Sequence, residues 1–274
     1  MQLARKLLTL SPLPIALEVR EGKGAVVTME VNDSIWQEEE LAEQYLNGIR
    51  GAIPMAQEQM NMMLRLINFS QKEVTAVLDL GCGDGVLGQV VLDQFPAARG
   101  IFVDFSESML DAARRRLVDY EDRASILYAD YGDRDWRSEN QRLENGNFDV
   151  IVSGFSIHHQ PDARKKELYA ELYDALKPGG IFINVEHVAS RSKWGEMMFE
   201  EAFVDSLVAY HKAINSGQSR GQIAQDLYNR PDKDANILAP VEDQCRWLRE
   251  IGFIHVDCYL KYFELAVFAG IRPA

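Results

Sequence analysis

The chain has little of three things that mark particular classes of protein. It contains 3 cysteines in 274 residues, and none of them forms a C-x-x-C pair. The thiols are therefore expected to be reduced rather than to form a disulfide framework. No apolar run approaches the roughly 20 residues that span a bilayer. Pro12 and Pro14 interrupt the amino-terminal apolar stretch, so we expect no signal peptide and a cytoplasmic location.

Basic residues are also scarce relative to acidic ones. The chain carries 29 Lys and Arg against 42 Asp and Glu, which gives a formal net charge of -13. Nucleic acids and anionic membrane surfaces are bound through clustered Lys and Arg, so neither is an expected partner. The local basic run at residues 114–116 is interpreted as a solvated helix face. The composition is that of an ordinary intracellular enzyme, long enough for one domain with additional segments.

Glycine is concentrated in one segment. VLDLGCGDGVLG, residues 77–88, contains four glycines directly after an apolar run. Glycine lets a backbone approach a ligand closely and adopt positive φ. Counted from Gly83, the segment matches the dinucleotide fingerprint GxGxxG, and Asp104 follows at the required spacing. Counted from Gly81, the pattern is Asp-x-Gly-x-Gly-x-Gly. The apolar strand runs directly into Gly81, which places the turn there.

In the second register the segment resembles motif I of the class I S-adenosylmethionine-dependent methyltransferases. In that family the loop lies against the methionine end of the cofactor. The resemblance therefore implies that Asp79, Gly81 and Gly83 contact S-adenosylmethionine (SAM). SAM has no pyrophosphate and carries a sulfonium, so an acidic residue at the loop suits SAM and repels a dinucleotide phosphate. The resemblance covers about residues 74–271.

Strand-like and helix-like segments alternate in the way that builds a parallel sheet with helices on both faces. We predict an α/β, Rossmann-like fold with a mostly parallel sheet of seven strands, the last two forming a hairpin. The methyltransferase domain is expected over residues 70–274, with a helical lid insertion at 188–240. Residues 1–69 are predicted to be an N-terminal extension with lid helices; sheet cover or a homodimer contact is the alternative for these segments. The candidate wall residues of the substrate pocket are Arg50, Phe199, Phe203 and Tyr210.

Ligands of open α/β sheets bind at the carboxyl ends of the strands. Asp104 ends the second predicted strand and is expected to accept both ribose hydroxyls. By the resemblance, Met109 packs on the adenine, Asp130 accepts from the adenine amino group and Tyr131 borders the ring. Ser153 lies, by the same resemblance, where the chain passes beneath the sulfonium. Roles at a helix start, in the core or in a solvated turn are the alternatives.

Two further strand ends carry residues suited to proton transfer. His158 follows the fourth predicted strand, and a histidine there is able to take a proton from a nucleophilic oxygen or nitrogen. Glu186 and His187 end the fifth, where a carboxylate beside an imidazole orients a base or binds a cationic substrate. Helix capping and a solvent-facing strand end are the structural alternatives. His158 and His159 are adjacent and point in different directions, so no metal site is expected.

Together these residues predict an enzyme that transfers the methyl group of SAM to a small-molecule acceptor by in-line displacement. Its candidate catalytic residues are His158 and Glu186. The acceptor atom is not specified by the sequence. Three alternatives stay open: a SAM-dependent enzyme that modifies a tRNA wobble nucleotide or the cofactor itself, a nicotinamide oxidoreductase, and a non-catalytic SAM-binding protein.

Overall fold

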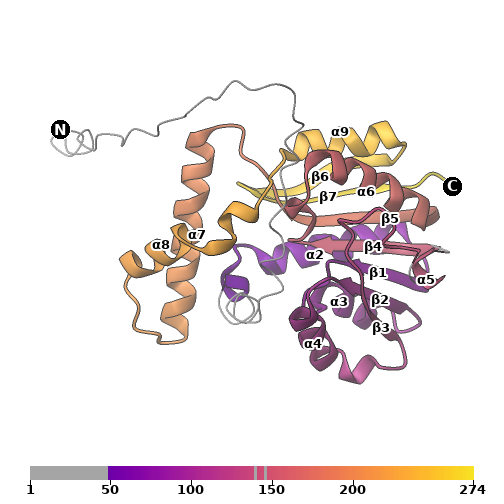
Figure 1. The fold of residues 1–274 in the computed structure, drawn as a ribbon, viewed down its shortest axis with the longest axis horizontal. Coiled ribbons are helices and arrows are strands. Elements are labelled where there is room, and N and C mark those ends of the chain that lie inside the picture. The colour runs from indigo at the N-terminus through magenta and orange to yellow at the C-terminus, as the bar shows by residue number, and fades with distance from the viewer. Residues whose placement is uncertain (1–48, 139–140, 145–146) are drawn as a thin grey trace, which may run out of the picture. The chain divides into compact units, whose positions relative to one another are not determined.

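The computed structural model describes residues 49–274 except 139–140 and 145–146. Within these residues seven strands form one sheet: β1 (Ala76–Leu80), β2 (Arg99–Asp104), β3 (Ala124–Tyr128), β4 (Phe148–Gly154), β5 (Leu176–His187), β6 (Ile254–Tyr262) and β7 (Leu265–Ile271). The order across the sheet is β3-β2-β1-β4-β5-β7-β6 (Figure 1). The first five strands are parallel, whereas β7 is antiparallel to both of its neighbours. The predicted α/β, Rossmann-like fold and its terminal hairpin are confirmed.

Helices pack on both faces of this sheet (Figure 1). The α-helices are α2 (Ala56–Ser70), α3 (Val86–Gln94), α4 (Glu107–Arg116), α5 (Gln141–Glu144), α6 (Asp162–Ala175), α7 (Lys193–Ala213), α8 (Arg220–Tyr228) and α9 (Val241–Ile251). One hydrophobic core joins α2, α3 and α4 to the sheet, and another joins α6 and α9 to its other face. Val77 lies in the first core and Leu78 in the second, because successive side chains of a strand point to opposite faces. Burial on both faces explains why β1 is apolar at every position except Asp79.

The segment after β5 forms helices α7 and α8, which lie beside the sheet within the predicted insertion (Figure 1). They share a separate core with the short helix η2 (Ile49–Ala52). The two ends of the insertion meet, because the Ala189 N–H donates to the Ala239 carbonyl at 3.0 Å. The end of β5 and the start of α9 are therefore neighbours, and the insertion lies between them. The lid helices predicted before residue 49 lie outside the described residues.

The end of the insertion is fastened to the short helix η4 (Ile157–His159). The Ile237 N–H donates to the His158 carbonyl at 3.0 Å. The His159 Nδ1 pairs with the Ala235 carbonyl, also at 3.0 Å. The Lys165 ammonium, which is fully buried, donates to the Ile237 carbonyl. These contacts fix the position of the insertion relative to the two histidines.

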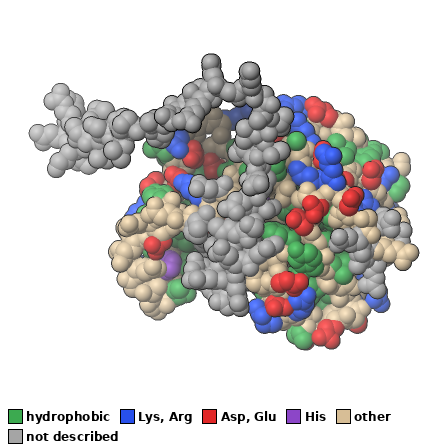
Figure 2. Space-filling view, in the orientation of Figure 1, with side chains coloured by type: hydrophobic (Ala, Val, Ile, Leu, Met, Phe, Trp, Pro, Cys, Tyr) green, Lys and Arg blue, Asp and Glu red, His purple; other side chains and the backbone are tan. Residues whose placement is uncertain are grey.

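The surface mixes charges of both signs. Acidic and basic side chains lie side by side on the face shown in Figure 2. The basic run at residues 114–116 also has acidic neighbours. Arg114 pairs with Glu107 at 3.6 Å, and Arg116 pairs with Asp84 at 2.6 Å. Among the described residues, no helix has both the length and the apolar character that crossing a membrane requires.

Candidate active site

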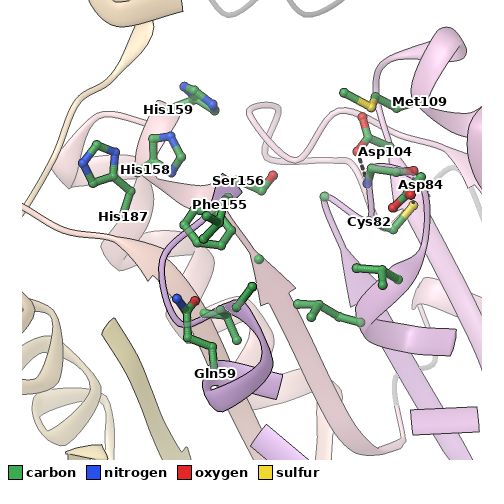
Figure 3. A pocket seen from close by; sticks show the side chains of 18 of the residues that line it. Gln59, Cys82, Asp84, Asp104, Met109, Phe155, Ser156, His158, His159 and His187 are labelled. Carbon is green, nitrogen blue, oxygen red and sulfur yellow. Dashed lines mark hydrogen bonds between the residues drawn. The ribbon is translucent and has the colours of Figure 1, made fainter. Parts of the chain in front are cut away.

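A cavity of about 480 Å³ lies at the carboxyl ends of β1, β2, β4 and β5 (Figure 3). This is where ligands bind in open α/β sheets. We call one part of its lining the glycine end, which consists of Asp79, Gly81, Cys82, Gly83, Asp84, Asp104 and Met109. The other part is the histidine end, which consists of Phe155, His158, His159, His187, Phe199, Phe203, Arg230, Asp232 and Asn236. Five of the predicted cofactor residues and His158 thus line the same cavity.

Backbone geometry explains the glycines of the loop. Gly81 and Gly83 have φ of +61° and +55°, a region that favours glycine. A β-carbon at Gly81 would lie 1.8 Å from the Ser156 Oγ and 2.5 Å from its Cβ, so this position has no room for a side chain. At Gly83 the nearest atom to a β-carbon would be the Met109 Sδ, at 4.0 Å. Gly83 therefore presents bare backbone to open space in the cavity.

Asp104 braces the loop as well as lining the cavity. Its Oδ2 accepts the Gly83 N–H and its Oδ1 accepts the Ser106 N–H, both at 2.9 Å. The carboxylate therefore joins the end of β2 to the glycine loop and to the start of α4. Burial raises the pKa of Asp104, although these hydrogen bonds favour the ionised form. Asp79 has a related position, with its Oδ2 accepting the Gly88 N–H at 2.8 Å.

An ion pair at the rim of the glycine end was not predicted. The Arg116 guanidinium donates from Nε and Nη2 to the Asp84 Oδ2, at 3.0 and 2.6 Å. Both residues line the cavity. The sequence placed Arg116 within a basic run and gave no signal for this partner, which is 32 positions away.

Three predicted cofactor residues lie outside the lining of this cavity. The Tyr131 hydroxyl pairs with the Ser156 Oγ at 2.5 Å, next to Gly81. The Ser153 Oγ donates to the Leu80 carbonyl at 2.7 Å, where it joins β4 to β1. The Asp130 Oδ1 accepts the Gly132 N–H at 2.7 Å, as in a turn. Their roles toward SAM remain predictions.

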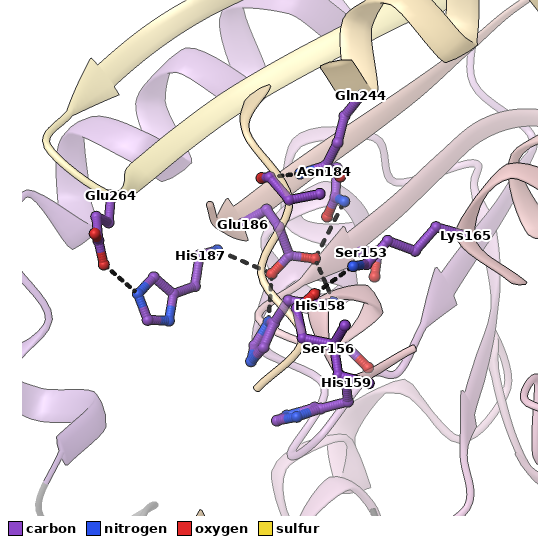
Figure 4. Close-up of polar contacts among 12 residues, drawn as sticks. Ser153, Ser156, His158, His159, Lys165, Asn184, Glu186, His187, Gln244 and Glu264 are labelled. Atoms are coloured by element: carbon purple, nitrogen blue, oxygen red, sulfur yellow. Dashed lines mark hydrogen bonds and ion pairs between the residues drawn. The ribbon is translucent and has the colours of Figure 1, made fainter. Parts of the chain in front are cut away.

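At the histidine end, Glu186 pairs with His158 (Figure 4). The Glu186 Oε1 lies 2.6 Å from the His158 Nδ1 and accepts the His187 N–H at 2.9 Å. Its Oε2 accepts the His158 N–H at 3.1 Å and the Asn184 amide at 3.2 Å. Glu186 is 0% exposed, and it reaches the cavity only through His158. The structure therefore brings the two predicted catalytic residues together.

Burial controls the ionisation of this pair. It raises the pKa of Glu186 to about 7, against the opposing effect of the hydrogen bonds. It also holds the pKa of His158 well below its ordinary value, and the nearby His187 and Lys165 act in the same direction. Burial lowers the pKa of His159 to about 3. At neutral pH the imidazoles of His158 and His159 are therefore uncharged.

His187 belongs to a second imidazole–carboxylate pair. Adjacent strand residues point to opposite faces, so Glu186 and His187 do not face each other. The His187 Nε2 instead lies 3.1 Å from the Glu264 Oε2. Burial favours the neutral acid, but hydrogen bonds from His187 and Ser190 hold the pKa of Glu264 below its ordinary value. The sequence signal for this partner is weak, because 77 positions separate the two residues.

The lining also includes part of the predicted wall. Phe199 and Phe203 of α7 line the histidine end, and their rings stack at 5.7 Å between centroids. Tyr210 lies outside the lining, and the side chain of Arg50 is outside the described residues. Among the described residues, no group of three His, Cys, Asp or Glu is arranged to hold a metal ion.

Comparisons with known proteins agree on one kind of domain. Residues 77–180 match the family model of a methyltransferase domain. The chain is 27% identical over 243 residues to a carboxy-S-adenosyl-L-methionine synthase of Desulforapulum autotrophicum, covering 86% of this chain and 90% of that protein. It is 26% identical over 197 residues to a trans-aconitate 2-methyltransferase of Variovorax paradoxus, covering 66% and 69%. Human N-acetylserotonin methyltransferase in complex with SAM shares the fold, with a TM-score of 0.57 at 12% identity over 90% of this chain and 60% of that chain.

The crowding at Gly81 leads to a test with a matched control. Gly81→Ala is expected to lower the free energy of unfolding by about 1–3 kcal/mol more than Gly179→Ala, because the new methyl group overlaps Ser156. Gly179 also has positive φ, but a β-carbon there would meet nothing within 4 Å. Its substitution therefore costs about 1–2 kcal/mol from backbone conformation alone. Urea unfolding of both variants measures the difference, and equal losses would contradict the close contact.

Proposed function

We propose that this chain, a class I SAM-dependent methyltransferase that acts on a small molecule, transfers the methyl group to an acceptor hydroxyl that His158 deprotonates. The observation that carries this proposal is the position of the His158–Glu186 pair. It lies at the far end of the cavity that begins at the glycine loop. A nucleophile placed between the two ends would meet the methyl group on one side and a base on the other.

The glycine end fits SAM. The space in front of Gly83 admits a ligand against the backbone, and Asp104 keeps acceptor capacity beyond the two N–H groups that it binds. We assign the ribose hydroxyls to Asp104, the adenine side to Met109 and the methionyl end to Gly81 and Gly83. When bound, SAM supplies a methyl group on a sulfonium. The acidic side chains at this end suit that positive charge.

Proton transfer is assigned to the His158–Glu186 pair. The short contact to Glu186 assigns the ring proton to the His158 Nδ1, so Nε2 is the nitrogen that accepts, in competition with the hydrogen bond that the Asn236 side chain makes to this ring. In the reaction the acceptor oxygen bonds to the methyl carbon as the sulfur–methyl bond breaks. The hydroxyl proton goes to Nε2, and Glu186 stabilises the imidazolium that results. His187, backed by Glu264, is the second group at this end able to take a proton.

The insertion is assigned to the acceptor. We propose that residues 188–240 form a lid that excludes water and selects the substrate, because α7 supplies Phe199 and Phe203 to the cavity. Residues 1–69 are proposed to complete this cover. From the described part of that segment, the cavity is lined by Gly51, Ile53, Ala56, Gln59 and Met60.

A second candidate function is chemistry on the cofactor itself. The Desulforapulum relative is named for making a carboxylated form of SAM, and it matches this chain over 90% of its length. Both candidates require SAM at the glycine end. In the first candidate the acceptor gains a carbon, as a methyl group. In the second candidate the molecule derived from SAM gains it. The nicotinamide alternative requires the other register of the glycine loop, whereas β1 ends at Leu80 and the turn begins at Gly81.

Further expectations concern partners and location. We propose a cytoplasmic protein, supported by three cysteines that are all free thiols. We also propose a homodimer with no nucleic-acid partner, in line with the formal charge of -13. Trp194 and Met197 of α7 are 71% and 55% exposed and offer apolar surface for a contact between copies.

Cofactor binding is tested by calorimetry with SAM, its demethylated product S-adenosylhomocysteine, and NADH. We expect SAM and S-adenosylhomocysteine to bind and NADH not to bind. Asp104→Ala should weaken SAM binding by about 1.5–3 kcal/mol, the usual loss for a hydrogen bond to a charged group. Asp111→Ala, an exposed acidic position on α4, is the control and should change nothing. NADH binding that depends on Asp104 would support the oxidoreductase instead.

The identity of the modified product is tested separately. The protein is incubated with SAM carrying a labelled methyl group and a pool of small hydroxylated compounds, and the products are analysed by mass spectrometry. A labelled methyl group on an acceptor, together with S-adenosylhomocysteine, is the expected result. A SAM-derived product of increased mass supports the second candidate.

The base is tested by the titration of His158. As pH falls through about 7, a proton joins Glu186, so the carboxylate that stabilises a protonated His158 is present above this pH and lost below it. NMR of ¹³C-labelled histidine should show a transition near pH 7 for the His158 ring, assigned with His158→Gln. In Glu186→Gln that transition should disappear, leaving the ring to titrate well below its ordinary pKa. An unchanged midpoint would contradict the pairing.

A further inference from the structure

Arg230 lies where two cavities meet. A second cavity of about 330 Å³ adjoins the histidine end. The residues that line both cavities are His187, Phe199, Phe203, Arg230 and Asn236. A guanidinium at this junction faces a small molecule in the first cavity and any extension of that molecule into the second.

The Arg230 guanidinium has donors without acceptors. Its side chain is 17% exposed, and its Nε lies 3.3 Å from the Asp232 Oδ2 in an ion pair. Among the described residues, no hydrogen bond to the guanidinium is formed, and its buried Nε lacks a partner in hydrogen-bonding geometry. A guanidinium has five N–H donors. Leaving them unpaired away from water is unfavourable, so a ligand that brings acceptor oxygens would be stabilised here.

The other basic residues of the two cavities are already paired. Arg116 at the glycine end makes two hydrogen bonds to Asp84. Lys233 in the second cavity pairs with Glu200 at 2.8 Å. Among the described lining residues, Arg230 is therefore the basic group with donors available to a ligand.

We propose that Arg230 binds a carboxylate of the methyl acceptor, which makes the acceptor a hydroxyl-bearing carboxylic acid; this rests on the function proposed above. A carboxylate matches the fork of a guanidinium with two parallel hydrogen bonds. Asp232 offsets part of the positive charge and His158 and His159 are neutral, so the site suits a single negative charge better than a phosphate dianion.

Arg230 and His158 line the same cavity, so a carboxylate held by the guanidinium lies in the cavity that also contains the proposed base.

The experiment titrates small probes into the full-length protein saturated with S-adenosylhomocysteine. Three carboxylates are compared with their neutral primary amides: benzoate with benzamide, phenylacetate with phenylacetamide, and succinate with succinamide. At least one carboxylate should bind about tenfold more tightly than its amide, a difference of about 1.4 kcal/mol. Arg230→Gln should reduce this preference to near unity, and Arg230→Lys should restore part of it.

Controls separate binding from folding. Arg191→Gln removes a charge that pairs with Glu242 and Asp243 outside both cavities, so the preference should persist. Thermal unfolding and S-adenosylhomocysteine affinity should be unchanged in Arg230→Gln. The proposal is overturned if no carboxylate binds better than its amide, if Arg230→Gln keeps the preference, or if phenyl phosphate binds more tightly than benzoate. Failure of S-adenosylhomocysteine to bind would instead overturn the proposed function, and the probe titrations without it still decide the role of Arg230.

Discussion

The four hydrogen bonds that converge on the buried Glu186 carboxylate hold the histidine end together. They come from the backbone and ring of His158, the backbone of His187 and the amide of Asn184. A carboxylate without water requires such donors, because an unpaired buried charge is strongly unfavourable. The same bonds join the end of β5 to η4. The hydrogen bonds that stabilise the buried Glu186 carboxylate therefore also fix the position of His158.

Asp104 has the corresponding place at the glycine end. It also ends a parallel strand, accepts backbone N–H groups from the neighbouring loop and has a pKa raised by burial. Two carboxylates therefore flank one cavity, one on each side of the strand-order reversal at β1 and β4. Asp104 lines the cavity directly, whereas Glu186 reaches it only through His158.

The sequence predicted what depends on local pattern. The register of the glycine loop and the strand ends at Asp104 and Glu186 follow from an apolar run and the residue that stops it. Side-chain pairs between distant positions were harder to predict. Glu264 pairs with His187 across 77 positions, and Arg116 pairs with Asp84 across 32, because packing brings these residues together. The donors of Arg230 are recognisable only when its surroundings are known. The directions of the Tyr131 and Ser153 side chains likewise depend on β-sheet neighbours that no spacing rule identifies.

The hydrogen bond between Ala189 and Ala239 closes the insertion on itself. A loop with touching ends behaves as a module, because its length and contents are able to change without moving β5 and α9, the two elements that flank it. The last residues of the insertion are bound to η4 through the Ile237 N–H. An exchanged insertion that keeps this hydrogen bond would still place its cavity-lining residues beside His158. If this segment selects the acceptor as proposed, exchange of one continuous segment changes the substrate range while the part of the enzyme that binds the methyl donor stays constant.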